Sequence, residues 1–139
     1  MRKIKFRGKR IDNGEWVYGY YVKYEHMGVI KHIIVTNWAQ VYVNSFEVRH
    51  ETIGQFTGLK DKNGKEIYEG DVLCYKDENY EDGIIGWEVF YEDGSFMASL
   101  TDGKDTFGGD FQLQEYAISD KLYCEIIGNI HNRKVEKWL

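Results

Sequence analysis

The side chains that could do chemistry are scattered along this sequence. Glu69 and Asp71 could form a carboxylate pair, but no base accompanies them, and a structural role for Asp71 is favoured. Because zinc and non-haem iron sites need several ligands at close range, a metal site would have to be assembled by the fold alone. We expect no resident metal or cofactor. The histidines show neither HxH nor HxxxH spacing: His26, His32, His50 and His131.

Nucleophilic and nucleotide-dependent chemistry also lack their usual signals. There is no phosphate loop of the GxxxxGK type and no GxGxxG turn. Cys74 and Cys124 have no basic neighbour that would clearly lower a thiol pKa, and two cysteines are too few for a disulfide scaffold. The acidic stretch 77–82 lacks the spacing of a calcium-binding EF-hand loop. The sequence therefore predicts a protein that is not an enzyme and that keeps its thiols reduced in the cytoplasm.

Turn signals at short spacing indicate the elements that carry these residues. Gly and Asn or Asp supply the positive φ of tight hairpin turns, and five such pairs predict an antiparallel β protein. The pairs are Asn13-Gly14, Asn63-Gly64, Asp82-Gly83, Asp93-Gly94 and Asp102-Gly103. The predicted strands span 15–24, 29–36, 40–43, 52–57, 66–75, 84–91, 95–100 and 125–130. Segments 37–46 and 112–120 are the best candidates for helix.

Composition indicates a folded, aromatic-rich chain. The 139 residues are 16% aromatic and contain no proline, unlike a disordered chain, and they suffice for one compact domain or two small lobes. No apolar run approaches the roughly 20 residues that cross a bilayer. We expect a soluble, cytoplasmic protein with no membrane partner.

Charge is distributed unevenly. Residues 1–40 carry a net charge of +5, whereas residues 61–139 carry −10. In the first strand, alternation places Ile4 and Phe6 on one face and the three basic residues Lys3, Lys5 and Arg7 on the other. This face is either the solvated side of an edge strand or first strand, or it is a phosphate-contacting strip, with Trp16 and Tyr18, or Trp38, stacking on bases.

One segment near the middle has a specific pattern. Residues 54–73 hold two apolar segments around a polar loop with Asn63-Gly64 at its tip, and Gly70 then permits a sharp bend. Asp71 can bond nearby backbone amides at the entry to the next strand. This run resembles the signature of the YopX family, as do Ile4-Lys5-Phe6-Arg7 at the start and Ile127-Gly128-Asn129-Ile130 near the end. Its signature positions are Gly58, Asn63, Gly64, Tyr68, Gly70 and Asp71.

The resemblance has consequences for fold and setting. The family consists of small proteins carried mainly by bacteriophages and prophages, it has no established activity, and its C-terminal part looks like an SH3-like barrel. The order strand, long loop, strand, tight turn, strand after Val72 predicts the same barrel. We expect a mainly β protein, with a β-rich lobe over residues 1–57 and the SH3-like barrel over 58–139. The chain departs from the family at His50-Glu51, where a proline often precedes the acid, and in the basic tail 133–137.

Three functions remain open. The favoured one is a phage accessory protein that binds a host or phage protein, because small β folds present loops on a rigid scaffold. The second is a nucleic-acid-binding module that uses the basic first strand. The third is an enzyme whose site is assembled from dispersed acids such as Asp71 and from histidines. Abundant Tyr and Trp and the two oppositely charged regions also predict a homo-oligomer.

Overall fold

The structure is a computed structural model that describes residues 3–76, 84–101 and 110–132. These residues are mainly β: thirteen strands and three short 3-10 helices. The chain divides into two compact units, residues 1–56 (unit 1) and 57–139 (unit 2). The division falls after residue 56, where the sequence placed it after residue 57. Strand β5 (Gly54–Lys60) crosses the division.

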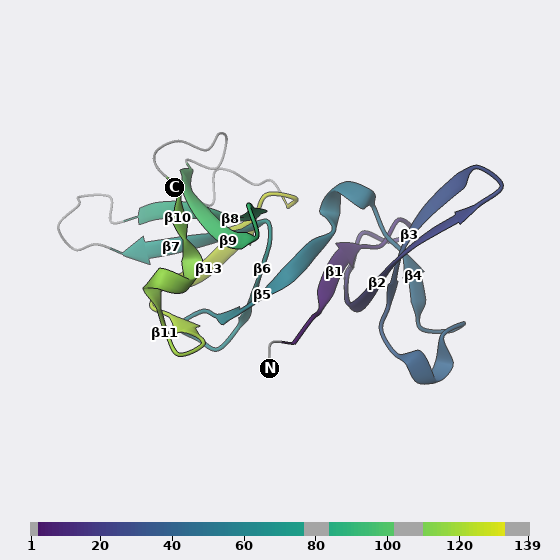
Figure 1. Ribbon diagram of the computed structural model, residues 1–139, viewed down its shortest axis with the longest axis horizontal. Coiled ribbons are helices and arrows are strands. Elements are labelled where there is room, and N and C mark those ends of the chain that lie inside the picture. Colours follow the sequence, from purple (N-terminus) through teal and green to yellow (C-terminus); the bar gives the residue numbers. More distant parts are fainter. Residues whose placement is uncertain (1–2, 77–83, 102–109, 133–139) are drawn as a thin grey trace. The chain divides into compact units, whose positions relative to one another are not determined.

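Unit 1 is an antiparallel sheet (Figure 1). Strand β1 (Phe6–Lys9) pairs with β2 (Trp16–His26) on one side and with the first residues of β5 on the other. Strand β2 pairs onward with β3 (Val29–Val35), which pairs with the short β4 (Ser45–Glu47). Two 3-10 helices, η1 (Trp38–Gln40) and η2 (His50–Thr52), flank β4 in sequence. Of the two expected positions, edge strand or first strand, β1 takes the second: it is the first strand of the chain and lies inside the sheet.

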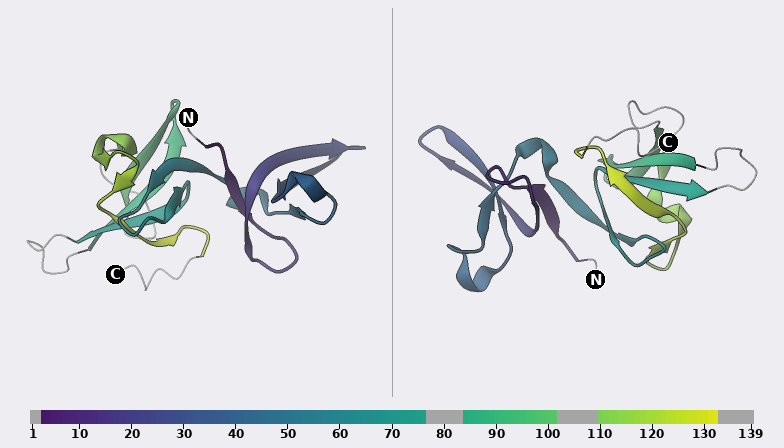
Figure 2. Two further views of the ribbon diagram at one scale, coloured as in Figure 1. Left: turned by 90° about the horizontal axis from the view of Figure 1, so that it is seen from below. Right: turned by 180° about the vertical axis from the view of Figure 1, so that it is seen from behind.

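Gly19 marks the point where β2 changes partners. Residues 16–19 pair with β1, whereas residues 20–26 pair with β3. A Cβ atom at Gly19 would lie 2.2 Å from the carbonyl oxygen of Val35, so only glycine allows the two backbones to approach this closely. Beyond this point β2 and β3 project together as a hairpin (Figures 1 and 2). Met27 and Gly28 close it with φ values of 50° and 77°, the pattern of a type I′ turn.

Unit 2 is built on a five-stranded antiparallel sheet in the order β10-β9-β8-β7-β13. These strands are β7 (Asp71–Lys76), β8 (Ile84–Glu92), β9 (Ser95–Thr101), β10 (Phe111–Gln112) and β13 (Glu125–Asn129). The ladder between β7 and β13 shifts register between Ile126 and Gly128. Strand β6 (Glu66–Tyr68) pairs with β5. Strand β12 (Lys121–Leu122) pairs in parallel with β5 at Lys60, and it pairs antiparallel with β11 (Ala117–Ile118). The third 3-10 helix, η3 (Leu113–Tyr116), follows β10.

The core of unit 2 lies against one face of this sheet. Leu73, Val89 and Ala98 come from neighbouring strands and share that face, because side chains on a strand alternate. Trp87 and Phe111 pack against the cluster with their ring centroids 5.0 Å apart, edge to face. The remaining buried members are Leu59, Ile67, Leu113, Leu122 and Cys124.

The predicted elements compare with the structure as follows. The turns at Asn13-Gly14, Asn63-Gly64 and Asp93-Gly94 are confirmed by the positive φ of their glycines; Asp82-Gly83 and Asp102-Gly103 lie outside the described residues. The strand expected over 40–43 and the helices over 37–46 and 112–120 are wrong, because only one short 3-10 helix forms within each longer segment. The strand expected over 66–75 is interrupted at Gly70, whose φ is 88°.

The mainly β prediction is confirmed, but its finer detail is not. The described residues form two sheets, and neither closes into a barrel. The SH3-like barrel therefore stays a prediction.

Candidate functional site

The predicted nucleic-acid contacts do not form one exposed strip. Lys3 is exposed and Lys5 half-buried, but Arg7 is only 5% exposed. The Arg7 guanidinium carbon lies 4.4 Å from the ring centroid of Trp16, and the Lys9 ammonium lies 5.4 Å from the same ring. Cation–π contacts of this kind occupy the aromatic face that a base would need. Tyr18 stays exposed.

The alternation expected for the first strand is also wrong. Ile4, placed on the inner face by the pattern, precedes β1 and is 62% exposed, while Arg7, placed outside, is buried. The cause is the position of β1 between two strands, which leaves Arg7 opposite Tyr18 on one side and Gly54 on the other. A charged residue is buried there because its guanidinium has an aromatic partner.

Two histidines that are distant in sequence meet in unit 1. The rings of His32 in β3 and His50 in η2 have centroids 4.6 Å apart. The Tyr21 hydroxyl lies 2.6 Å from Nδ1 of His32, and Phe6 packs on the Tyr21 ring. Among the described residues, no group of three or more His, Cys, Asp and Glu side chains could hold a metal ion. No local sequence pattern predicts the histidine pair, because it forms only where β4 returns antiparallel beside β3 and the Val48 amide bonds the His32 carbonyl.

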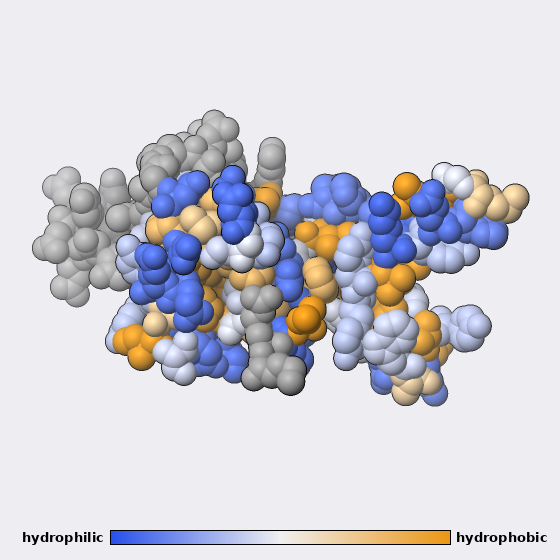
Figure 3. Space-filling model, in the orientation of Figure 1, coloured by the Kyte–Doolittle hydropathy of each residue, from blue (hydrophilic) through white to orange (hydrophobic). Residues whose placement is uncertain are grey.

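An exposed apolar surface of unit 1 lies on the hairpin formed by residues 20–35, which we call the ribbon. Every residue from Lys23 to Lys31, its tip, is exposed. The tip carries large apolar side chains: Met27 is 89% exposed, and Val29 and Ile30 are about half exposed. Apolar colour reaches the end of the hairpin in Figure 3. Soluble proteins expose single apolar residues routinely, but a run of this kind indicates an interaction surface.

Strand register divides these side chains between two faces. Tyr20, Tyr24 and Val29 share one face, and Trp38 extends it by packing on Tyr20 with ring centroids 5.6 Å apart. Ile30 lies on the other face, opposite Glu25. The loop after Trp38 adds exposed Tyr42 and Val43 to unit 1.

The edges of the ribbon tip are open within the described residues. The pairing of β2 with β1 ends at Gly19, and β4 pairs only with residues 33–35 of β3. Within the described residues, 24–26 and 29–31 therefore have ladder partners only in each other. Unpaired backbone N–H and C=O groups along a strand edge are the template that an incoming strand needs.

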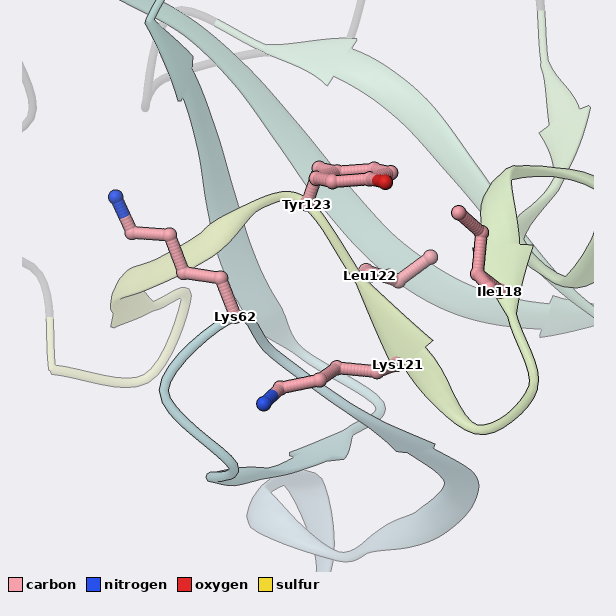
Figure 4. Close-up of a pocket in the computed structure, with 5 residues that line it drawn as sticks. All are labelled: Lys62, Ile118, Lys121, Leu122 and Tyr123. Atoms are coloured by element: carbon pink, nitrogen blue, oxygen red, sulfur yellow. The ribbon is translucent and has the colours of Figure 1, made fainter.

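A second candidate site is a pocket of about 330 Å³ in unit 2 (Figure 4). Lys62, Ile118, Lys121, Leu122 and Tyr123 line it. The lysine amino groups lie toward one side in Figure 4, and the other three side chains lie toward the other. The volume is at the lower end of the range for small-ligand sites.

Comparison with known proteins identifies the family. The sequence profile described as "YopX protein" matches residues 5–134, nearly the whole chain. The chain belongs to the YopX family. The crystal structure of protein EF1440 from Enterococcus faecalis is similar in fold, with a TM-score of 0.51 and 25% sequence identity over 94% of this chain and 95% of that one. No curated protein matches the sequence. Within the described residues, no helix has the length and apolarity to cross a membrane.

The signature positions of this YopX-family chain lie around two buried carboxylates. Asp71 is buried, and its Oδ2 accepts a hydrogen bond from the Tyr68 amide at 2.8 Å. Gly70 between them has a φ of 88°, and its amide donates to the Val89 carbonyl. Gly58 and Gly64 also have positive φ, and Asn63 begins the turn that Gly64 completes. The signature residues therefore form the turns that connect β5, β6 and β7.

Sequence reasoning missed Asp61, the second buried carboxylate. Its Oδ1 accepts from the amides of Asn63 and Lys65, both at 2.9 Å, and its Oδ2 accepts from the Ile126 amide at 3.2 Å. The signal was present, because Asp two residues before Asn-Gly is the usual start of an Asx turn. Asp61 thereby fixes the loop that carries Lys62 and ties it to β13.

Glu88 in β8 is a half-buried carboxyl group of unit 2 whose pKa is clearly shifted. It lies opposite Val72 on β7 and Ser99 on β9, both buried. Burial raises the pKa of the Glu88 carboxyl above its ordinary value. Within the described residues it has no hydrogen-bond or ion-pair partner. Glu88 is therefore a determinant of stability.

Proposed function

We propose that this protein acts by binding another protein, without a catalytic step of its own, and that the ribbon is its contact surface. The observation that carries the proposal is the tip, where Met27, Val29 and Ile30 are exposed within a stretch in which every residue from 23 to 31 is exposed. Apolar surface removed from water contributes about 25 cal/mol per Å². A partner that covers these side chains therefore gains affinity from them.

The open edges support a particular mode of contact. A two-stranded hairpin is marginally stable by itself in water, and a third strand adds both a hydrogen-bond ladder and packing. Strand addition takes affinity from the backbone and specificity from alternate side chains. On this proposal Tyr20, Tyr24 and Val29 supply the specificity, because they lie on one face of the ribbon.

The setting is part of the proposal. Proteins of this family are carried mainly by bacteriophages and prophages. This supports a role as an accessory protein in the cytoplasm of a bacterial host. The same open edges would also accept a second copy of the chain, which supports the expected homo-oligomer.

Nucleic-acid binding by the first strand is the less favoured alternative. Arg7 is buried against Trp16, so two of the five expected contacts already engage each other. Lys3 and Tyr18 are exposed, but a strand with one buried arginine offers fewer phosphate contacts than the sequence indicated.

A photo-crosslinking residue tests the proposal in cells. It replaces Tyr24 on the ribbon in one variant and Glu15, an exposed residue before the hairpin, in a matched control. We expect one discrete protein adduct from position 24, insensitive to nuclease, and none from position 15. An adduct of the chain with itself would identify the partner as a second copy.

Equal adducts from both positions, or no protein adduct from position 24, would refute the ribbon as the contact surface. Recovery of nucleic acid that disappears when Lys3 and Lys5 are changed to Glu would instead establish the alternative.

A further inference from the structure

The pocket of unit 2 has an unbalanced charge at its rim. Lys121 lies directly opposite Lys60 in the parallel pairing of β12 with β5. Like charges placed opposite one another on neighbouring strands are unfavourable. Lys60 is compensated by Asp120 at 3.9 Å, but Lys121 has no acidic side chain within ion-pair distance among the described residues.

The second lysine of the pocket is only partly compensated. The Lys62 ammonium lies 3.6 Å from a carboxylate oxygen of Glu125, and both side chains remain nearly half exposed. An exposed pair of this kind is weak and can exchange partners. The rim therefore presents two ammonium groups against one carboxylate.

The rest of the pocket is apolar. Leu122 is buried at its base, while Ile118 and Tyr123 are largely exposed at its sides. The left-handed backbone of Ser119, with a φ of 60°, turns the chain between β11 and β12 and so places Ile118 and Lys121 at the same opening. A ligand that filled this space would bury apolar surface beside two cations (Figure 4).

We propose that this pocket binds an acidic peptide segment of the protein partner, one that carries an aromatic or aliphatic side chain next to a carboxylate. The apolar side chain would lie against Leu122 and Tyr123, and the carboxylate would complement Lys121 and Lys62. The lack of an acidic partner for Lys121 is typical of a functional site, because a ligand can supply the missing negative charge. This inference deepens the proposed protein-binding function and rests on it, but it assigns a second, chemically distinct contact.

The test uses the full chain and a defined probe. The peptide acetyl-Glu-Phe-Glu-Leu-amide is titrated against the isotope-labelled protein, and its neutral counterpart acetyl-Gln-Phe-Gln-Leu-amide is the control. We expect amide shifts at Lys62, Ile118 and Tyr123 with the acidic peptide, and affinity at least fivefold lower with the neutral one. Raising the sodium chloride concentration from about 0.15 M to 0.5 M should weaken the acidic peptide selectively.

Matched variants separate the pocket from general charge. Lys121→Gln should weaken the acidic peptide about fivefold, whereas Lys65→Gln, an exposed lysine outside the pocket lining, should leave its affinity unchanged. Because Lys121→Gln also removes the unfavourable pairing with Lys60, its midpoint of thermal unfolding should not fall. A purely structural role for Lys121 predicts the opposite change in stability.

The proposal is overturned if both peptides bind equally, if the acidic peptide gives no shifts in the pocket at millimolar concentration, or if both lysine variants weaken it alike. The ribbon variant Val29→Asp should leave peptide binding intact. If the chain with intact Val29 gives no ribbon crosslink but still binds the acidic peptide, only the ribbon is refuted. If it gives the ribbon crosslink but does not bind the peptide, only the pocket is refuted.

Discussion

Replacing Asp61 tests the physical account of unit 2 most sharply. Its carboxylate is 1% exposed and accepts three backbone hydrogen bonds, from Asn63, Lys65 and Ile126. Hydrogen bonds to a charged group contribute about 1.5–3 kcal/mol each, and the third is longer than the other two. Asp61→Ala should therefore lower the free energy of unfolding by about 4–6 kcal/mol, a large share of the stability of a small domain.

The matched variant Asp61→Asn keeps one oxygen of the same shape. An asparagine Oδ1 can still accept from the Asn63 and Lys65 amides, while its amide nitrogen faces the Ile126 amide without an acceptor. We expect a loss of about 2 kcal/mol, the usual cost of one buried donor left unsatisfied.

Urea unfolding followed by circular dichroism gives the overall loss of stability, and amide hydrogen exchange assigns it to a unit. Exchange of β5 and β13 amides should accelerate in Asp61→Ala, while β2 and β3 amides keep their rates. A loss below about 1 kcal/mol in Asp61→Ala, or equal losses in the two variants, would refute the role of the carboxylate.

Three further predictions concern other parts of the fold. Gly19→Ala should cost about 3 kcal/mol and accelerate exchange in β2 and β3 about a hundredfold, because its Cβ would lie 2.2 Å from the Val35 carbonyl oxygen; unchanged exchange would contradict the close approach. Burial raises the pKa of Glu88, so the folded state binds its proton more tightly and the free energy of unfolding falls as pH rises through that pKa. Glu88→Gln should therefore raise the unfolding midpoint at pH 7 but not below about pH 4, and an equal gain at both pH values would contradict this. The hydrogen bond and ion pair with Arg10 lower the pKa of the Asp12 carboxyl, so Arg10→Gln should return that pKa toward its ordinary value in an NMR titration.

Local chemistry explains why the strands could be predicted from the sequence. Asn13-Gly14, Asn63-Gly64 and Asp93-Gly94 favour the positive φ that their glycines adopt, so these turns could be predicted from residue type. The same reasoning anticipated the bend at Gly70 and the amide contact of Asp71.

Tertiary placement explains what the sequence could not provide. Alternation in the first strand assumed an exposed face, but β5 returns beside β1 and Arg7 becomes buried. The composition of segment 40–43 predicts a strand, yet within the described residues the segment pairs with no strand. Its first residue ends the 3-10 helix η1. The pocket is assembled from the turn after Asp61 and from β12, which lie about sixty residues apart. No local pattern encodes such an encounter.

The sequence predicted the two strands of the ribbon but not the turn at Met27 and Gly28 that joins them. Its strands were predicted nearly to their ends, but their exposure on both faces depends on where β1 and β4 stop pairing. Exposure of Met27, Val29 and Ile30 is therefore a property of topology rather than of composition.

Hydrogen exchange of the ribbon amides tests the central claim most directly. Exchange at residues 23–31 is compared between the isolated protein and the protein recovered with its crosslinked or co-purified partner. The protein-binding account predicts rapid exchange in the isolated chain, since these residues pair only with each other, and at least tenfold slower exchange in the complex. Unchanged exchange at 23–31, with new protection confined to β1 or to another part of the described chain, would show that the partner binds elsewhere and would contradict the account.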